Sequence, residues 1–253
     1  MTPANVPSSN RLIAALPAED QLRWWPQLES VELPLGRVLY ESGSTLGHVY
    51  FPTTAIVALL NVTGGGDTSE IAIVGNEGLV GISLLLGGET TTSRAVVQSA
   101  GQGFRIDAHA IKAEFGRSLP VKFLLLRYTQ ALITQMAQTA VCNRHHSLDQ
   151  QLCRLLLMML DRLHGNELTM TQQLTATMLG VRREGVTEAA VRMQRAGLIR
   201  YARGHVAVLD RAALEARSCE CYAVVRKEYE RLLPQAVAAV LPDGRPRPPA
   251  SDT

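Results

Sequence analysis

Short apolar runs separated by glycine-rich turns dominate residues 31 to 106. The runs are VLY, HVYF, AIVALLNV, EIAIV, RAVVQS and FRI, and the turns hold Gly43, Gly64 to Gly66, Gly75, Gly87 to Gly88 and Gly101. Many short strands at regular turn spacing are typical of an antiparallel barrel or jelly roll. We therefore predict an antiparallel β-roll as the main part of residues 11–118. Short helices over 11–28 precede it, and we expect Trp24 and Trp25 to pack against it.

A long helix is predicted next, over residues 119–146. Pro120 suits the first turn of a helix, and the run that follows continues for some 25 residues without Gly or Pro. A helix that is apolar around much of its circumference needs two covered faces. One face can pack on the β-roll and the other on the same helix of a second subunit, and the alternative is a helix buried wholly within one chain. The predicted dimer interface consists of Leu125, Tyr128, Leu132, Met136 and Ala140.

The stretch from Thr171 to Leu209 has the spacing of two helices joined by a tight turn, followed by a hairpin. Leu174, Met178, Leu179 and Val181 form one apolar cluster, and Val186, Ala189, Ala190 and Met193 recur at helical spacing. Gly180 lies between the two helices. This is the helix-turn-helix pattern, whose second helix can enter the major groove of DNA. We predict a winged helix-turn-helix domain over residues 147–233, so the whole chain is of the α+β class.

Charge is distributed unevenly along the chain, although the net charge is only +2. Residues 1–118 hold 7 Lys and Arg against 11 Asp and Glu, whereas residues 168–211 hold 7 Arg against 3 acids. A basic block on a helix-turn-helix attracts phosphates, so double-stranded DNA is the predicted partner. The alternatives are a solvated basic face and an interaction protein that has lost DNA binding. The predicted DNA-binding residues are Arg182, Arg183, Glu184, Thr187, Glu188, Arg192, Arg200, Arg203 and His205.

The order of β-roll, long apolar helix and winged helix-turn-helix resembles the Crp/Fnr family of bacterial transcription regulators. Gly180 matches the family's turn glycine, and Arg183 with Glu184 matches the pair near the start of its recognition helix. Gly197 to Ile199 match the exit into the wing, and Tyr201 to Leu209, with a turn at Arg203-Gly204, resembles the wing hairpin. The resemblance implies a homodimer that binds a two-fold symmetric DNA site, regulates transcription and is able to contact RNA polymerase.

Four residues depart from the family pattern in this region. Arg182 is a poor helix cap, and Gly185 costs about 1 kcal/mol of helix propensity relative to Ala. Glu188 stands where another arginine is usual. It can pair with Arg192 one turn on or accept a hydrogen bond from a cytosine amino group. Thr175 occupies a position that is usually apolar.

The β-roll resembles a cyclic-nucleotide-binding domain but lacks two of the expected ligand groups. Gly81 and Arg94 match the family positions, whereas Ile82 replaces the glutamate that binds the ribose and Ala95 replaces the serine beside the arginine. Each buried ribose hydroxyl left unpaired costs about 1 to 3 kcal/mol. We therefore predict that cyclic AMP does not bind tightly, that no cofactor is bound, and that these four positions mark the site of an unknown effector.

Cysteine and histidine supply the only metal-type candidates. No cysteine precedes Cys142, so the N-terminal iron–sulfur cluster of some family members is absent. We predict no metal site, with cysteines in the core and histidines at a helix end. The alternative is a metal site at Cys142, His146, Cys219 and Cys221, or a thiol- or metal-based redox sensor that uses Cys142, Cys153, Cys219 and Cys221.

Other function classes lack support in the sequence. His48 and His109 stand alone without the HxH spacing of a metal-binding jelly roll, and no phosphate loop, nucleophile elbow or HExxH is present, so we predict no enzyme activity. The chain shows no secretory signal and no membrane span, and four cysteines fit reduced thiols, so we expect a cytoplasmic protein. Residues 1–10 and 234–253 are predicted to be disordered.

Overall fold

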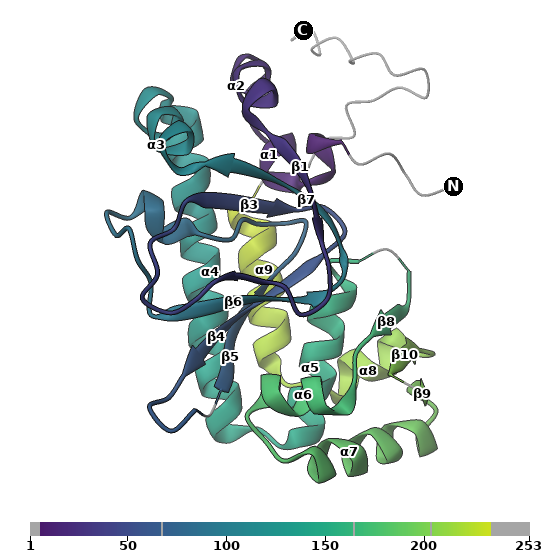
Figure 1. Ribbon diagram of the computed structural model, residues 1–253. Helices are drawn as coiled ribbons and strands as arrows, with labels where there is room; N and C mark the ends of the chain where they lie inside the picture. Colours follow the sequence, from purple (N-terminus) through teal and green to yellow (C-terminus); the bar gives the residue numbers. More distant parts are fainter. Residues whose placement is uncertain (1–5, 67, 164, 203, 234–253) are drawn as a thin grey trace, which may run out of the picture.

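The computed structural model describes residues 6–66, 68–163, 165–202 and 204–233, so the predicted tail 234–253 lies outside it. A β-roll, one long helix and a C-terminal helical region with a small sheet make up the fold (Figure 1). The strands are β1 (Glu29–Leu33), β2 (Val38–Tyr40), β3 (His48–Pro52), β4 (Ile56–Val62), β5 (Thr68–Val74), β6 (Ser93–Ser99), β7 (Gly101–Asp107), β8 (Glu167–Thr169), β9 (Ile199–Ala202) and β10 (His205–Val208). The α-helices are α1 (Arg11–Ala14), α2 (Ala18–Trp24), α3 (Ala108–Arg117), α4 (Leu119–His145), α5 (Leu148–Leu160), α6 (Gln172–Leu179), α7 (Arg183–Arg195), α8 (Arg211–Arg217) and α9 (Glu220–Leu232), and the 3-10 helices are η1 (Pro7–Ser9), η2 (Trp25–Gln27) and η3 (Ile82–Leu85).

Two antiparallel sheets form the β-roll, with strand orders β1-β7-β3 and β2-β6-β4-β5. Every apolar run predicted as a strand is found in one of these strands, which confirms the predicted β-roll. The apolar part of β4, from Ile56 to Leu60, is buried at every position because this central strand is covered on both faces. At Gly103 in β7 a Cβ atom would lie 2.7 Å from the Phe51 carbonyl oxygen, so only glycine permits this approach to β3.

The segment before the β-roll is ordered from residue 6 onward, so the prediction of disorder over residues 1–10 is wrong for residues 6–10, while 1–5 lie outside the described residues. Asn10 is fully buried, and its amide donates to the carbonyl oxygens of Pro52 at 2.8 Å and Gly78 at 2.9 Å. Its side-chain oxygen caps α1. A buried asparagine whose polar atoms are all hydrogen-bonded can thus fix a segment that its polar composition predicted to be disordered.

The two adjacent tryptophans behave differently. Trp24 is buried and meets Phe51 edge-to-face with ring centroids 5.8 Å apart, as predicted. Trp25 is 43% exposed, so the prediction that it also packs on the β-roll is wrong. Trp24 ends α2 and Trp25 begins η2, and because consecutive residues of a helical turn point in different directions, only Trp24 faces the sheet.

Helix α4 runs along the β-roll and ends beside the C-terminal region (Figure 1). Ser118 caps its first turn, and Pro120 occupies that turn as predicted. Tyr128 is fully buried and donates to the Leu79 carbonyl oxygen at 2.8 Å, in a position where Gly78 leaves room for its ring. One face of α4 thus belongs to the core of a single chain.

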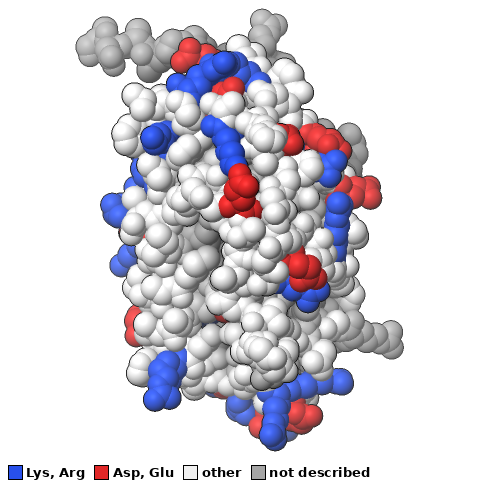
Figure 2. Space-filling view, turned by 60° about the vertical axis from the view of Figure 1, so that its left-hand side comes forward, with Lys and Arg blue, Asp and Glu red and all other residues white. Residues whose placement is uncertain are grey.

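The predicted dimer residues require a correction. Leu125, Tyr128 and Leu132 are buried inside the chain, because α4 packs against β5, α3 and α9. Met136 is half-buried and Ala140 is exposed. The apolar side chains that α4 leaves in contact with solvent are Leu119, Phe123, Leu126, Ile133 and Val141. Figure 2 shows the side of the molecule on which α4 lies, and few charged side chains occupy its central area.

The C-terminal region begins with a capping box. The Ser147 hydroxyl accepts from Gln150 N, and the Gln150 side chain accepts from Ser147 N. Beyond α5, strand β8 joins the β9–β10 hairpin in a sheet of order β8-β10-β9. The chain then returns through α8, and α9 packs along α4 (Figure 1). None of the described helices is long and apolar enough to cross a membrane.

Candidate nucleic-acid interface

Helix α6 and the turn after it are fixed by local hydrogen bonds. The Thr171 side chain accepts from Leu174 N and caps α6. Gly180 adopts the left-handed conformation with φ 64°, which ends α6 and lets Val181 N donate to the Ala176 carbonyl oxygen at 3.0 Å. The predicted turn glycine is therefore required by the backbone conformation.

Helix α7 has one buried face and one solvent face. Its buried residues are Val186, Ala189, Ala190 and Met193, as the spacing predicted. These residues pack toward α5 and α6. The other face of α7 lies on the outside of the molecule (Figure 1). A helix packed in this way can present its exposed side chains to a binding partner while its packing contacts stay intact.

The start of α7 exposes the side chains of Arg182, Arg183, Glu184 and Glu188. Among the described residues, the side chains of Arg182, Arg183 and Glu184 take part in no hydrogen bond or ion pair. Figure 2 shows Lys and Arg side chains gathered at the end of the molecule where α7 lies. Free guanidinium groups at a helix N-terminus can meet phosphates and guanine edges.

The departures noted in the sequence have structural reasons. A Cβ atom on Gly185 would lie 3.1 Å from Leu148 Cδ2, so the glycine lets α7 approach α5. Thr175 is buried, and its hydroxyl donates to the Thr171 carbonyl oxygen at 2.9 Å, which satisfies it in an apolar position. Arg182 makes no side-chain cap, as expected.

Arg192, one of the predicted DNA-binding residues, is already engaged within the domain. It forms a two-pronged ion pair with Asp149 of α5, with Nη2 2.6 Å from Oδ1 and Nε 3.1 Å from Oδ2. Glu188 lies 3.9 Å from Arg192, so the expected pair within α7 is the weaker contact. The Thr187 hydroxyl lies 2.9 Å from Gln172 Oε1 and 3.0 Å from the Arg183 carbonyl oxygen, so Thr187 also ties α7 to α6.

The hairpin that follows α7 is anchored by Tyr201. Its hydroxyl donates to the Met170 carbonyl oxygen at 2.7 Å, and its backbone N–H donates to Gln194 Oε1 at 3.0 Å. Arg200 is exposed, 4.0 Å from Glu167, and His205 is exposed on β10. Arg203 lies outside the described residues. Two of the three predicted wing residues are thus exposed to solvent.

The candidate effector residues lie around η3 and β6. Gly81 has φ 104° and precedes η3, and Ile82 packs against the apolar core. Arg94 pairs with Glu41 at 3.0 Å, and Ala95 is fully buried. Ile82 therefore offers no carboxylate to a ligand, and Arg94 is already paired with an acidic side chain.

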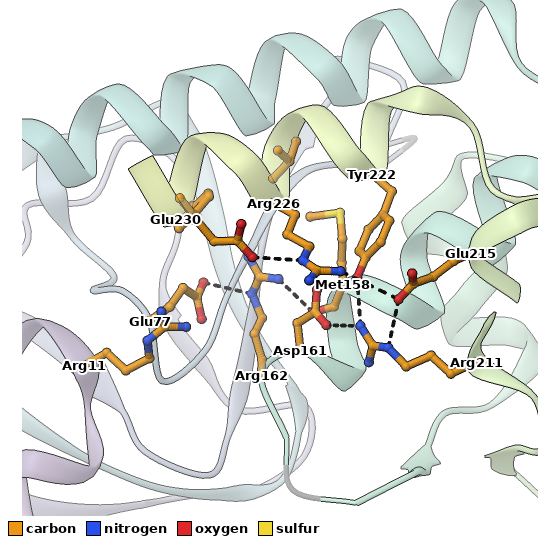
Figure 3. A pocket seen from close by; sticks show the side chains of 12 residues that line it. Arg11, Glu77, Met158, Asp161, Arg162, Arg211, Glu215, Tyr222, Arg226 and Glu230 are labelled. Carbon is orange, nitrogen blue, oxygen red and sulfur yellow. Dashed lines mark hydrogen bonds and ion pairs between the residues drawn. The ribbon is translucent and has the colours of Figure 1, made fainter. Parts of the chain in front are cut away.

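A polar pocket of about 540 Å³ was not predicted from the sequence. It lies between α5, α8, α9 and the β-roll, and is lined by arginines and carboxylates in equal number (Figure 3). Arg162 pairs with Glu77, Arg211 with Asp161 and Glu215, and Arg226 with Glu230. The helical spacing of the Arg226 and Glu230 pair was visible in the sequence, whereas the long-range partners were not. The opposite charges of these pairs offset one another. The Arg162–Glu77 pair connects the C-terminal region to the β-roll.

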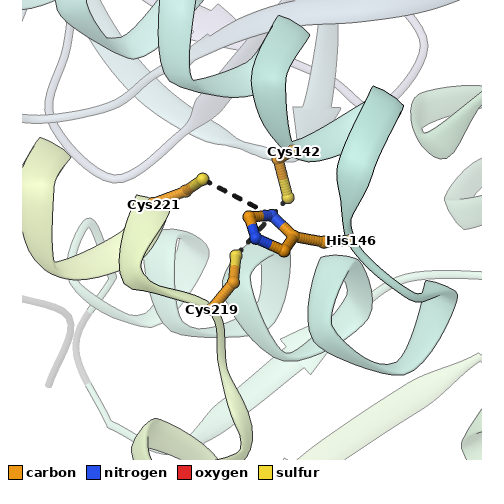
Figure 4. A group of neighbouring side chains, drawn as sticks. All are labelled: Cys142, His146, Cys219 and Cys221. Atoms are coloured by element: carbon orange, nitrogen blue, oxygen red, sulfur yellow. Dashed lines mark hydrogen bonds between the residues drawn. The ribbon is translucent and has the colours of Figure 1, made fainter.

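The structure also brings together Cys142, His146, Cys219 and Cys221, the four residues kept as the alternative metal site (Figure 4). Cys153 is buried and does not belong to this group, so only three of the four cysteines of the alternative redox set lie in it. The hydrogen bond between the Cys142 and Cys219 sulfurs is the main effect that lowers the pKa of Cys219 below its usual value.

Comparison with known proteins agrees with this architecture. Residues 150–217 match the model of the Crp-like helix-turn-helix domain. A transcriptional regulator of the Crp/Fnr family from Eubacterium rectale is 17% identical, with a TM-score of 0.64 over 83% of this chain and 98% of that chain. FixK2 of Bradyrhizobium japonicum is 15% identical, with a TM-score of 0.67 over 76% and 98%. The c-di-GMP responsive regulator CLP of Xanthomonas campestris is 14% identical, with a TM-score of 0.61 over 77% and 100%.

No curated protein matches the sequence. The structural matches confirm the fold that the sequence predicted, and the family model confirms a Crp-like helix-turn-helix domain. The chain therefore has the fold of Crp/Fnr transcription regulators, and its residues 150–217 form a Crp-like helix-turn-helix domain.

Proposed function

We propose that this chain, whose residues 150–217 form a Crp-like helix-turn-helix domain on a Crp/Fnr fold, is a homodimeric regulator of transcription that binds specific DNA sites. The observation that carries the proposal is the accessible start of α7, where Arg182 and Arg183 are exposed and have no acidic partner among the described residues. Because neither guanidinium is buried or paired within the protein, both are available to bind a negatively charged ligand.

In the proposed complex, α7 enters the major groove. Arg183 and Glu184 contact base edges, with the guanidinium suited to guanine and the carboxylate to a cytosine amino group. Arg182 meets a phosphate or a neighbouring base, and Glu188 is a second acceptor one turn along the exposed face. Arg200 and His205 lie near phosphates at the wing. Base contacts specify the site, and phosphate contacts position the protein on it.

The proposed dimer uses the solvent face of α4. Leu119, Leu126 and Ile133 recur every seven residues, and Phe123 lies between the first two, which is the spacing of a coiled-coil seam. These four side chains are between 38% and 65% exposed in the single chain. Pairing two α4 helices along this seam would cover them and relate two α7 helices by a two-fold axis. A two-fold symmetric site with half-sites about one helical turn, ~34 Å, apart fits such a dimer.

The proposed role of the β-roll is to sense an effector other than cyclic AMP, and to present a surface for contact with RNA polymerase. Ile82 offers no acceptor for ribose hydroxyls, and Arg94 pairs with Glu41. The effector is therefore one that does not require a carboxylate at position 82. We propose no catalytic activity and no cofactor in the β-roll.

Selection of bound DNA from a random pool tests this proposal. The full-length protein is expected to enrich one inverted-repeat sequence, and fluorescence anisotropy should then show tight binding that weakens steeply with salt. Recovery of no enriched sequence, together with equal weak binding to all duplexes, would contradict a sequence-specific regulator. Repeating the selection with added cyclic AMP should leave the enriched sequence and its affinity unchanged.

A further inference from the structure

Four potential metal ligands meet where the long helix ends. Cys142 lies in the last turns of α4, and His146 is the residue at which α4 stops. Cys219 occupies the N-cap position of α9 without a side-chain capping bond, and Cys221 lies in the first turn of α9 (Figure 4). The chain separation between the two pairs is more than 70 residues, so the packing of α9 against α4 creates the group.

The ligand atoms have the spacing of a single tetrahedral ion. All four lie within 4.8 Å of one another. The Cys142 and Cys219 sulfurs are 3.5 Å apart, and the Cys221 sulfur lies 3.6 Å from His146 Nδ1. A zinc ion bound at ~2.3 Å to sulfur and ~2.0 Å to nitrogen places neighbouring ligand atoms roughly 3.5 to 3.8 Å apart. The four ligands of a cubane iron–sulfur cluster bind four separate irons and stand farther apart.

The orientation of His146 supports the same conclusion. Its Nδ1 faces the sulfurs, while its Nε2 lies 3.3 Å from a carboxylate oxygen of Glu220. Metal-binding histidines typically give their second ring nitrogen to a carboxylate, which fixes the ring and its tautomer. Gln151 donates to the His146 carbonyl oxygen at 2.9 Å and so also holds this residue in place.

The surroundings of the group are closed and carry a compensating charge. Cys142 and Cys221 are fully buried and Cys219 is 5% exposed. Three thiolates and a neutral imidazole around a divalent ion leave one net negative charge. Arg154 is buried and electrostatically coupled to the sulfurs, and its Nε has no hydrogen-bond partner among the described atoms. A buried cation beside such a site offsets the cost of burying that charge.

A disulfide or plain apolar packing accounts for the group less well. The sulfur atoms of Cys142 and Cys219 stand well beyond the ~2.05 Å of a disulfide bond, and all four cysteines of the chain are free. The three cysteines form a cluster separate from the main apolar core. A histidine ring nitrogen aimed into a purely apolar cluster would lose a hydrogen bond to water without gaining a strong partner.

We propose that Cys142, His146, Cys219 and Cys221 bind one zinc ion that fastens α9 to the end of α4. Each thiol that binds loses its proton to solvent, and no oxidation or reduction takes place. With four protein ligands the site is closed to water, so its role is structural. Its position, between the proposed dimer helix and α5, lets it hold the C-terminal domain in register with α4.

Metal analysis of full-length, untagged protein tests the proposal, with Cys153→Ala as the matched control because Cys153 is buried outside the group. The wild type and Cys153→Ala should each hold about one zinc per chain, and Cys221→Ala should hold little. Zinc at wild-type content in Cys221→Ala would overturn the proposal. So would iron with acid-labile sulfide in place of zinc, or a wild type that fails to take up added zinc.

A second measurement covers the case in which Cys221→Ala fails to fold. Glu220→Gln changes an exposed side chain that touches His146 and no sulfur. Competition with a chromophoric chelator should show zinc binding about 10- to 100-fold weaker than in the wild type. Glu228→Gln, on the same helix and paired with Arg231, should bind zinc as the wild type does. Equal affinity in all three proteins would contradict the assigned role of His146. None of these measurements depends on DNA binding.

Discussion

Arg162 and Glu77 form a buried ion pair across 85 residues of sequence, with Nε 2.8 Å from Oε1. Both side chains are 6% exposed. The guanidinium also donates to the Met158 carbonyl oxygen at 2.7 Å and to Gln135 Oε1 at 3.1 Å. The pair therefore joins α5, α4 and the β-roll (Figure 3), and it links the proposed sensor to the region that leads into the helix-turn-helix.

Glu77→Ala is expected to destabilise the protein by about 3 to 5 kcal/mol, because it leaves the buried Arg162 charge uncompensated. Chemical denaturation gives the free energy of unfolding. Glu41→Ala is the matched control, since the carboxylate of Glu41 is 59% exposed and its pair with Arg94 contributes only ~0 to 1 kcal/mol. Equal losses in the two variants would show that the buried pair carries no special weight.

Because Glu70 is buried, the free energy of unfolding should fall as pH rises. Burial raises the pKa of this carboxyl from 4.5 to about 7, against the opposing effect of Arg154 and Arg162. The native state therefore holds the proton more tightly than the unfolded chain. Its stabilising contribution is complete below the unfolded pKa and is lost as pH rises through about 7. The loss is on the order of 3 kcal/mol.

The measurement is the free energy of unfolding of the wild type and Glu70→Gln between pH 4.5 and 8. Glutamine cannot ionise, so the difference between the two proteins should change in favour of the variant as pH rises. A difference that stays constant over this range would mean that Glu70 titrates normally.

Ile133→Lys tests the proposed dimer. A charge in the middle of the exposed α4 seam should oppose pairing, because burying an unpaired ammonium is costly. Sedimentation equilibrium should show a dimer for the wild type and a monomer for the variant at the same concentration. Leu22→Lys changes an apolar residue on α2 that is 67% exposed, against 54% for Ile133, and that lies outside the seam, so this variant should remain dimeric. A wild type that is monomeric, or an Ile133→Lys protein that stays dimeric, would contradict this interface.

The sequence predicted the helix-turn-helix well because its determinants are local. Thr171 and Gly180 lie within one turn of their partners, the apolar positions of α7 recur at helical spacing, and each has the predicted place in the structure. The sequence alone did not explain Thr175 and Gly185. The hydrogen bond from Thr175 to Thr171 and the close approach of Gly185 to Leu148 explain them in the structure.

The orientation of α4 could not be predicted in the same way. Apolar side chains surround much of this helix, so its pattern does not show which face lies inward. That choice depends on α9, which follows α4 by more than 70 residues and covers one side of it. Leu125 and Leu132 were therefore assigned to the wrong surface, and Phe123 and Ile133 were missed. The same packing of α9 on α4 assembles Cys142 with Cys219, and the packing of α7 on α5 pairs Arg192 with Asp149.

The most direct test of the central claim is a titration of the selected DNA site with wild type and Arg183→Ala. The account predicts that the variant binds this site roughly 5- to 150-fold more weakly, equivalent to about 1 to 3 kcal/mol, and discriminates less at one base pair of each half-site. Arg37→Ala, which removes an exposed arginine from the β-roll, should bind as the wild type does. Equal affinity and equal discrimination for Arg183→Ala and wild type would contradict the claim that α7 recognises DNA through this residue.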